Sequence, residues 1–514
     1  MRRGRKHRTR ALALVAGIIA AAALGGCGPA PRASSATPPA VPGASGPNGT
    51  GAPGDSANPA SLGAALAAAI STDDVVNDLT RLDAIATANG GNRAAGSPGF
   101  DASASFVADE LRSAGYGVTL DPVAMTVFRQ EAPTVLEVLG PVATAFQDAH
   151  DLKAMLLSPS GDVTGPLVAL GFDPNVQPGA RTGLGCDPGD WSEVPAGAIA
   201  LVQPGNCRRH DAIVNAQEAG VAAVITSYVD WAPDHVLRPT LVTPEDITVP
   251  AIGVTGATGV ALFAAAQAGA RVHVATHTAV VQTTSSSVIA ETKGGDTSHV
   301  VMIGGHLDSV IDGPGVNDDG SGTMAILEMA RELARLRPDG APWKVRFAFW
   351  TGEELGLFGS FHYVGGLGDD EVRKLEAYLN LDMIGSPNSF RQVYDMSGGS
   401  RPAAAGVLAA RLEQALRDAG LSAESANIGG SSDHVAFDQA GVPVGGLFSG
   451  ANEIVSADEA VLFGATAGAA ADACYHLACD TIANVDRAPL EQLARAAAEV
   501  LGNLAEGATA LPPG

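Results

Sequence analysis

Apolar runs with the character of strands alternate with helical stretches across the C-terminal half of this chain. Strands are expected at 288–290, 300–303, 345–349, 377–381 and 442–447, and helices at 323–336 and 403–419. Parallel strands need long crossover connections, which helices usually supply. The alternation therefore predicts an α/β fold with a largely parallel, mixed sheet that helices cover on both faces. The helical patterns at 73–88 and 102–114 and the strand at 117–120 need partners, which places them in the same domain.

The first 27 residues have the pattern of an export signal peptide, with six basic residues before an apolar run. This run, from Ala11 to Leu24, is shorter than the roughly 20 residues that a membrane-spanning helix needs. The following Gly25-Gly26-Cys27 completes a pattern similar to a bacterial lipobox, in which the cysteine is lipidated. The prediction is a cell-surface lipoprotein anchored only at Cys27, and the alternative is an extracellular protein with an incidental cysteine.

Residues 28–60 contain almost no large apolar side chains, so they cannot bury enough surface to fold, and a disordered linker is expected. Loss of the six basic residues of the leader would take the formal net charge from −24 to −30. Such acidity argues against nucleic acid as a partner, and we expect a monomer.

Short apolar strands and turns without a cluster of catalytic residue types fill residues 141–283. The segments Cys186 to Asp190, Gly197 to Cys207 and Thr248 to Ile252 resemble the protease-associated domain, a β-rich lid inserted in several exported peptidases. That resemblance implies substrate gating or protein interaction, with a purely stabilising role as the alternative. The predicted domain boundaries are 61–140 for the first part of the main domain, 141–283 for the insert and 284–508 for the second part.

Four cysteines remain besides Cys27. Bridges between Cys186 and Cys207 and between Cys474 and Cys479 are favoured because each pair is local in sequence, although four cysteines allow three connectivities. An oxidising compartment would preserve both bridges. A zinc site made of all four thiolates is disfavoured, because neither pair has the short spacing of a zinc knuckle.

Five side chains of metal-binding type follow predicted strands or lie in loops: His306, Asp318, Glu354, Asp382 and His476. Loops at strand ends are where α/β sheets present chemistry. Taken singly, each has a structural explanation, such as a helix cap for Asp318 or a solvated charge pair for Glu353 and Glu354. Taken together they predict a two-metal hydrolase, in which Asp308 accepts the free ring N–H of His306 and Glu353 transfers protons.

Five motifs follow one another along the chain: His306-Leu-Asp308, Asn317-Asp-Asp-Gly-Ser-Gly322, Glu353-Glu-Leu-Gly-Leu-Phe-Gly-Ser360, Asn380-Leu-Asp-Met383 and Cys474-Tyr-His-Leu-Ala-Cys-Asp480. In this order they resemble the bacterial co-catalytic di-zinc aminopeptidases of the secreted leucine aminopeptidase type, over residues 73–508. The resemblance implies a zinc-exopeptidase fold that holds two zinc ions.

In residues, the resemblance implies one zinc on His306 and Asp382, another on Glu354 and His476, and Asp318 as the bridging ligand. It further implies that Glu353 is the general base, that Asp308 orients His306 and that Tyr475 helps to stabilise the oxyanion. A cis peptide between Asp318 and Asp319 is expected as well.

The predicted reaction is removal of N-terminal residues, large apolar ones such as Leu, from peptides or proteins through a metal-bridging hydroxide. Zinc brings the pKa of its bound water toward neutrality, and Glu353 would take that proton and deliver it to the leaving amine. Manganese or cobalt would also suit these ligands. Met383 and the loop at 429–437 are expected to shape the side-chain pocket.

Two alternative functions remain open. A carboxypeptidase of the same fold would need clustered arginines, which the site motifs lack. A non-catalytic binding protein would have lost metal ligands, whereas this chain keeps all five. Glutaminyl cyclases share the fold but use one zinc, so the complete ligand set argues against them.

Overall fold

The computed structural model describes residues 61–176, 184–228, 236, 238–241, 243–508 and 511–512. The predicted signal peptide, the lipobox with Cys27 and the linker up to residue 60 lie outside the described residues. Within the described part, no helix has both the length and the apolar character needed to span a membrane.

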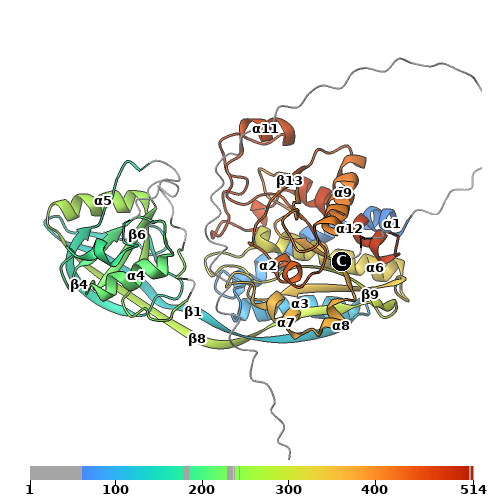
Figure 1. The fold of residues 1–514 in the computed structure, drawn as a ribbon, viewed down its shortest axis with the longest axis horizontal. Coiled ribbons are helices and arrows are strands. Elements are labelled where there is room, and N and C mark those ends of the chain that lie inside the picture. The colour runs from blue at the N-terminus through green and yellow to red at the C-terminus, as the bar shows by residue number, and fades with distance from the viewer. Residues whose placement is uncertain are drawn as a thin grey trace, which may run out of the picture.

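The described strands form one hydrogen-bonded sheet, which runs through two masses of the molecule (Figure 1). On one side the order is β13 (Glu424–Ala426), β12 (Gln392–Tyr394), β14 (Val444–Phe448), β11 (Leu375–Leu381), β9 (Asp296–His306), β10 (Trp343–Trp350) and β8 (Arg271–Glu291). It continues through β4 (Gly161–Ala169), β5 (Ile199–Val202), β6 (Ala223–Tyr228), β7 (Ala251–Thr255) and β3 (Leu152–Ala154). Pairing is parallel among β14, β11, β9 and β10 and again among β4, β5, β6 and β7.

A long antiparallel ribbon joins the two masses. It consists of β1 (Gly117–Gly140) and β8, paired from Gly117 opposite Glu291 to Gly140 opposite Arg271, and β2 (Thr144–Phe146) adds to the far end of β1. Near one end β8 pairs with β10, and toward the other it pairs with β4. The strands predicted at 117–120 and 288–290 are thus the ends of much longer strands. The proposed boundary at 283/284 lies within β8.

Helices cover both faces of the larger mass, as the sequence pattern predicted. One face packs against α1 (Leu62–Ala69), α2 (Thr72–Ala88), α3 (Pro98–Ser113), α6 (Gly322–Leu336), α9 (Pro402–Asp418) and α12 (Arg487–Ala505). The opposite face packs against α7 (Phe358–Gly366) and α10 (His434–Gln439). Alternate residues of β9 divide between the two cores, with Val301 and Ile303 in the first and Val300 and Met302 in the second. The predicted fold class, a mixed α/β sheet flanked by helices, is confirmed.

One helix begins earlier than its apolar periodicity indicated. The pattern predicted a start at Ala102, but α3 begins at Pro98. Ser97 caps this helix by accepting a hydrogen bond from the backbone N–H of Phe100, and proline suits the first helical turn because it lacks an N–H. The connection between α2 and α3 is therefore the glycine-rich loop at 89–97.

The smaller mass has its own hydrophobic cores on either side of β5, β6 and β7. It also contains two helices, α4 (Arg209–Glu218) and α5 (Gly256–Gln267). The insert, expected to be β-rich, therefore combines its parallel strands with helices. The short helices α8 (Asp369–Val372) and α11 (Ala457–Phe463) belong to the larger mass. Both predicted disulfides are present, Cys186–Cys207 in the insert and Cys474–Cys479 in the main domain.

Candidate metal centre

Three neighbouring parallel strands bring their carboxyl ends to one edge of the main sheet. His306 is the last residue of β9, Glu353 and Glu354 follow β10, and Asp382 follows β11 directly. The register pairs Trp350 with His306, so adjacent strands end level with each other. Because the strands are buried on both faces, their ends are the first positions where polar side chains can gather.

The five predicted metal-type side chains come together at this edge. The Nε2 atom of His306 lies 3.1 Å from Asp318 Oδ1 and 3.6 Å from Asp382 Oδ1. On the other side, the Nε2 atom of His476 lies 3.1 Å from Asp318 Oδ2 and 3.2 Å from Glu354 Oε2. Asp318 therefore presents one carboxylate oxygen to each imidazole.

Two groups among the described residues have ligand atoms that all lie within 4.8 Å of one another, namely His306 with Asp318 and Glu354, and His306 with Asp319 and Asp382. Glu354 Oε1 and Asp319 Oδ2 are buried without a hydrogen-bond partner. Buried polar oxygens are rarely left unpaired, so these atoms fit a site built for cations. Nitrogen and carboxylate donors in this mixture suit zinc and also manganese or cobalt.

Asp308 is fully buried, and its carboxylate accepts hydrogen bonds from backbone N–H groups rather than from the imidazole of His306. Its two carboxylate oxygens accept hydrogen bonds from the N–H groups of Glu353 at 3.2 Å and Glu354 at 3.4 Å. Its carboxylate lies 3.9 Å from Nδ1 of His306, whereas its backbone carbonyl oxygen lies only 3.0 Å from that nitrogen. Asp308 thus contacts the predicted base, a predicted ligand and the ring of His306 at once.

The loop that carries Asp318, Val316–Ser321, is kinked, with a non-helical backbone at Asp318 and Asp319, and contains the expected cis peptide between these two residues. Asp319 Oδ1 accepts hydrogen bonds from the N–H groups of Gly322 at 2.9 Å and Met383 at 3.0 Å, which ties this loop to the end of β11. Sequence reasoning treated Asp319 only as a neighbour of Asp318. The pair of adjacent acids in the motif was its signal.

The Cys474–Cys479 loop supplies groups on the other side of the cluster. His476 adopts the left-handed conformation with φ 60°, and the ring of Tyr475 stacks on its imidazole at 3.8 Å between centroids. Asp480 accepts the N–H groups of Asn317 at 2.9 Å and Asp318 at 3.0 Å. The sequence motif included Asp480, but nothing in the motif assigned it this contact.

Negative charge dominates the electrostatics of the site. Burial, with added repulsion from Glu354 and Asp382, raises the pKa of Glu353 well above its ordinary value. Burial raises the pKa of Asp308 to about 7. For His306 burial alone would lower the pKa, but the charges of Glu353 and Asp382 outweigh it and raise the pKa well above 6.5. The cluster holds more buried carboxylate than its own cations neutralise, which a bound metal would correct.

Arg93 is a functional candidate that sequence reasoning missed. Its guanidinium is fully buried and donates from Nε to the carbonyl oxygen of Pro314 at 2.8 Å, and from its terminal nitrogens to the carbonyls of Leu307 and Gly315. These carbonyls belong to the loop between His306 and Asp318. A single basic residue in an otherwise neutral glycine-rich loop was the available signal.

The predicted pocket loop is partly buried. Gly429 to Ser431 are exposed, whereas Ser432, Asp433 and His434 are buried. His434 Nε2 lies 3.0 Å from the carbonyl oxygen of Gly429, which anchors the exposed segment. Met383 is buried beside Asp382 with φ 57°. Burial raises the pKa of Asp433, which sequence reasoning did not single out, to about 7.

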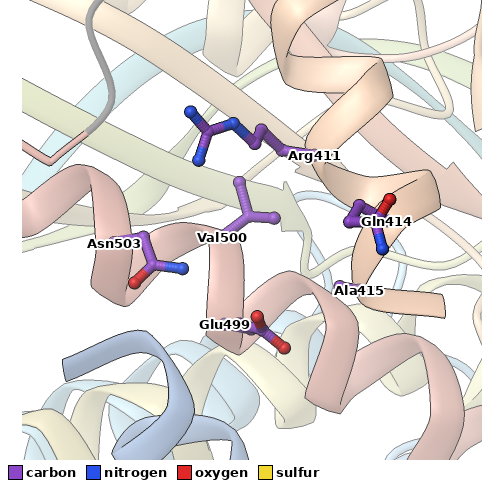
Figure 2. Close-up of a pocket in the computed structure, with 6 residues that line it drawn as sticks. All are labelled: Arg411, Gln414, Ala415, Glu499, Val500 and Asn503. Carbon is purple, nitrogen blue, oxygen red and sulfur yellow. The ribbon is translucent and has the colours of Figure 1, made fainter. Parts of the chain in front are cut away.

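A crevice elsewhere on the main domain has a different character. It lies between α9 and α12 with a cavity volume of about 80 Å³. Figure 2 shows the residues that line it, Arg411, Gln414, Ala415, Glu499, Val500 and Asn503. Glu499 is its one carboxylate, and no predicted metal-type residue lines it. Its size is that of a packing defect between helices rather than of a substrate site.

Two family models and several known proteins match this chain. A family model described as Peptidase family M28 matches residues 287–501, and one described as PA domain matches residues 163–262. The chain is 37% identical over 428 residues to "Aminopeptidase" of Pseudomonas aeruginosa, with 82% of this chain and 78% of that protein covered. It is 37% identical over 449 residues to "Probable lipoprotein aminopeptidase LpqL" of Mycobacterium tuberculosis, with 84% of each covered.

Among solved structures, the chain resembles BSAP, described as a zinc aminopeptidase from Bacillus subtilis. The two share 25% identity at a TM-score of 0.62, over 84% of this chain and 94% of the other. The likeness spans both the main domain and the insert.

Proposed function

Because this chain belongs to peptidase family M28 and is an aminopeptidase, we propose that it uses two zinc ions to remove N-terminal residues, preferably large apolar ones such as Leu, from peptides. The observation that carries the proposal is the position of Asp318, whose two carboxylate oxygens each lie 3.1 Å from a different imidazole. A carboxylate placed between two nitrogen donors is suited to bridge two cations.

The ligands follow from this geometry. His306 and Asp382 would hold one zinc, Glu354 and His476 the other, and Asp318 would bridge them. The unpaired oxygens of Glu354 and Asp319 and the excess of buried carboxylate support the binding of divalent cations. The solved zinc aminopeptidase that the chain resembles supports zinc as the metal. When bound, such ions polarise the scissile carbonyl and lower the pKa of the attacking water.

The chain's own residues would supply the proton transfers. Glu353 takes the proton from the attacking water and delivers it to the leaving amine, as a general base and then a general acid. Asp308 keeps Glu353 and Glu354 in place through their backbone N–H groups. The Tyr475 hydroxyl donates a hydrogen bond to the carbonyl oxygen of the substrate as negative charge develops there.

The requirement for a free N-terminus follows from charge. The carboxylates at the strand ends would attract an α-ammonium group, whereas an acetylated terminus offers no charge to them. Met383, beside Asp382, and the loop at 429–437 would then line the side-chain pocket. Among the described residues, no cluster of arginines faces the site to bind a substrate carboxylate, as the carboxypeptidase alternative requires. The guanidinium of Arg93 donates its hydrogen bonds to backbone carbonyls.

We further propose that the protein acts outside the cytoplasm, as a monomer. The two disulfides suit an oxidising compartment, and a relative from Mycobacterium tuberculosis carries the name of a lipoprotein. The disulfides support the compartment, and the name of the relative supports the lipobox interpretation of Cys27. Mass spectrometry of the membrane fraction would test it, since an unmodified Cys27 or cleavage at another residue contradicts the anchor.

The deciding experiment measures hydrolysis of aminoacyl p-nitroanilides beside their N-acetylated forms. We expect cleavage of the free-amine substrates only, fastest for Leu, lost on dialysis against a chelator and restored by zinc. Elemental analysis of the active protein should then find two zinc ions per chain. Lack of activity in the zinc-loaded protein, or full activity with one zinc, would contradict the proposal.

A further inference from the structure

A buried ion-pair cluster joins the insert to the main domain at the loop between His306 and Asp318. Asp312, in that loop, accepts a forked pair of hydrogen bonds from Arg238, with Nε at 2.8 Å and a terminal nitrogen at 3.0 Å. The Nζ atom of Lys153 lies 3.4 Å from the same carboxylate. The exposed fractions of these side chains are 12% for Asp312, 8% for Arg238 and 6% for Lys153, so water screens the charges poorly.

Both cations are fixed to the insert by backbone pairing. Lys153 lies in β3, which pairs with β7. The segment of Arg238 is held through its neighbours, since Leu156 donates its N–H to the carbonyl of Pro239 and accepts at its own carbonyl from the N–H of Leu241. The third guanidinium nitrogen of Arg238 donates to the carbonyl of Ala154 at 2.7 Å. The cations therefore cannot follow Asp312 if the two parts of the molecule separate.

The contacts from the insert favour the charged form of Asp312. Burial alone would raise the pKa of Asp312, but the hydrogen bond from Arg238 and the charges of Arg238 and Lys153 outweigh it and lower that pKa. A fork of two charge-assisted hydrogen bonds fixes direction as well as distance. Asp312 thus has one preferred position relative to the insert.

The loop of Asp312 touches several elements of the candidate metal centre. Ile311 accepts a hydrogen bond from Asn92, next to the buried Arg93. On the other side of Asp312, a Cβ placed on Gly313 would lie 2.3 Å from the carbonyl oxygen of Leu477, the residue after His476. Upstream, Ser309 links Asp308 to Gly313 through a 2.9 Å hydrogen bond from its hydroxyl to the Gly313 carbonyl. A shift of Asp312 would therefore be passed to both sides of the cluster.

We propose that Lys153, Arg238 and Asp312 form a clamp through which the insert positions the loop at 307–315, so that Asp312 is a positioning residue for peptide hydrolysis. The insert then contributes to turnover and not only to stability. This inference rests on the proposed aminopeptidase activity. Displacements of about 1 Å remote from the reacting atoms can cost up to about 100-fold in rate, so a clamp of this kind is large enough to matter.

The test compares full-length zinc-loaded Asp312→Asn and Arg238→Gln with wild type on Leu p-nitroanilide, at a temperature where all remain folded. We expect kcat to fall about 10-fold in each, with two zinc ions retained and KM changed less than kcat. The double variant should be no worse than Asp312→Asn alone, because that change already removes the charge that both Arg238 and Lys153 contact. Hydrogen exchange should accelerate in residues 307–315.

Arg331→Gln provides the matched control. Arg331 forms a partly buried ion pair with Asp78 and Glu110 that joins three helices of the main domain. Its loss should lower the unfolding temperature without changing kcat. If Asp312→Asn and Arg238→Gln behave as this control does, with wild-type kcat and wild-type exchange in the loop, the clamp has no positioning role and the proposal is overturned.

If Asp312→Asn does not fold, Arg238→Gln and Arg238→Lys decide. The glutamine variant should lose turnover, and the lysine variant, which keeps the charge but not the fork, should recover part of it. Wild-type kcat in both overturns the proposal. An inactive wild-type protein would instead overturn the proposed function, and loop exchange would still report on the clamp independently of activity.

Discussion

The main domain and the insert are built on the same plan but differ in what their strands lead to. In both, neighbouring parallel strands are buried on both faces and flanked by helices. β9, β10 and β11 lead to His306, the Glu353-Glu354 pair and Asp382, whereas β7 of the insert leads through Thr255 into the cap of α5, where its hydroxyl accepts the N–H of Thr258. Both metal-type groups found in the described residues lie in the main domain.

This difference shows that the sheet provides the place for chemistry and the first residues beyond each strand provide the chemistry itself. A helix cap pairs backbone N–H groups that would otherwise lack a partner. A buried cluster of carboxylates, in contrast, is stable only with a bound cation or with raised pKa values. The main domain is therefore expected to respond strongly to metal and the insert weakly.

Metal removal should separate the two regions most clearly. After dialysis against a chelator, we expect activity to vanish and hydrogen exchange to accelerate at residues 306–321 and 474–480, with little change at 199–202 of the insert. A ligand at 100 times its Kd stabilises a fold by about 2.7 kcal/mol, so the unfolding transition of the main domain should shift. Equal loss of protection in both regions would contradict the comparison.

Removal of the proposed base should be the next largest effect. Glu353→Gln is expected to lower kcat by about 10²- to 10⁴-fold while two zinc ions stay bound, because the amide cannot accept the proton of the attacking water. The control is Asp173→Asn in the insert, an exposed carboxylate shortly after β4 that should leave kcat unchanged. Wild-type turnover in Glu353→Gln, measured on Leu p-nitroanilide, would sink the assignment.

A smaller effect is expected at Asp480, which supports Asp318 from the disulfide loop. Asp480→Asn keeps one acceptor oxygen but turns an N–H donor toward one of the two backbone amides of Asn317 and Asp318. Groups that orient metal ligands typically contribute about 10- to 100-fold to metal affinity or activity. Zinc titration with a competing chelator measures the loss of zinc affinity. Asp486→Asn is the control, since Asp486 only caps α12 and asparagine caps equally well.

The two disulfides should differ in what their removal affects, stability for one and turnover for the other. Replacing Cys186 and Cys207 by serine opens a loop of 21 residues in the insert and should cost about 3 kcal/mol of unfolding free energy with kcat unchanged. Replacing Cys474 and Cys479 opens a loop of only 5 residues, so it should cost less stability but lower kcat severalfold, because His476 and Tyr475 lie between them. Denaturant titrations beside kcat measurements test both, and the reverse pattern would contradict the comparison.

Predictions from the sequence were most accurate where local pattern and motif spacing suffice. The helices near 73–88, 323–336 and 403–419 and both disulfides are present, and the five metal-type residues meet at one sheet edge. The ribbon of β1 and β8 was underestimated because residues 283–287 of β8 are all Thr or Ser, a composition typical of a connecting loop. Its strand character comes from pairing across some 150 residues of sequence, which no local window contains.

The sequence by itself determined the α/β class, the family and the set of side chains able to bind metal, because periodicity and residue type are local properties of the chain. The tertiary structure decided what holds those side chains: Arg93 on three carbonyls, Asp480 on the amides of Asn317 and Asp318, and Asp312 between two cations of the insert. A charged side chain reveals its partner only when burial removes water as an alternative, and burial depends on the closed fold.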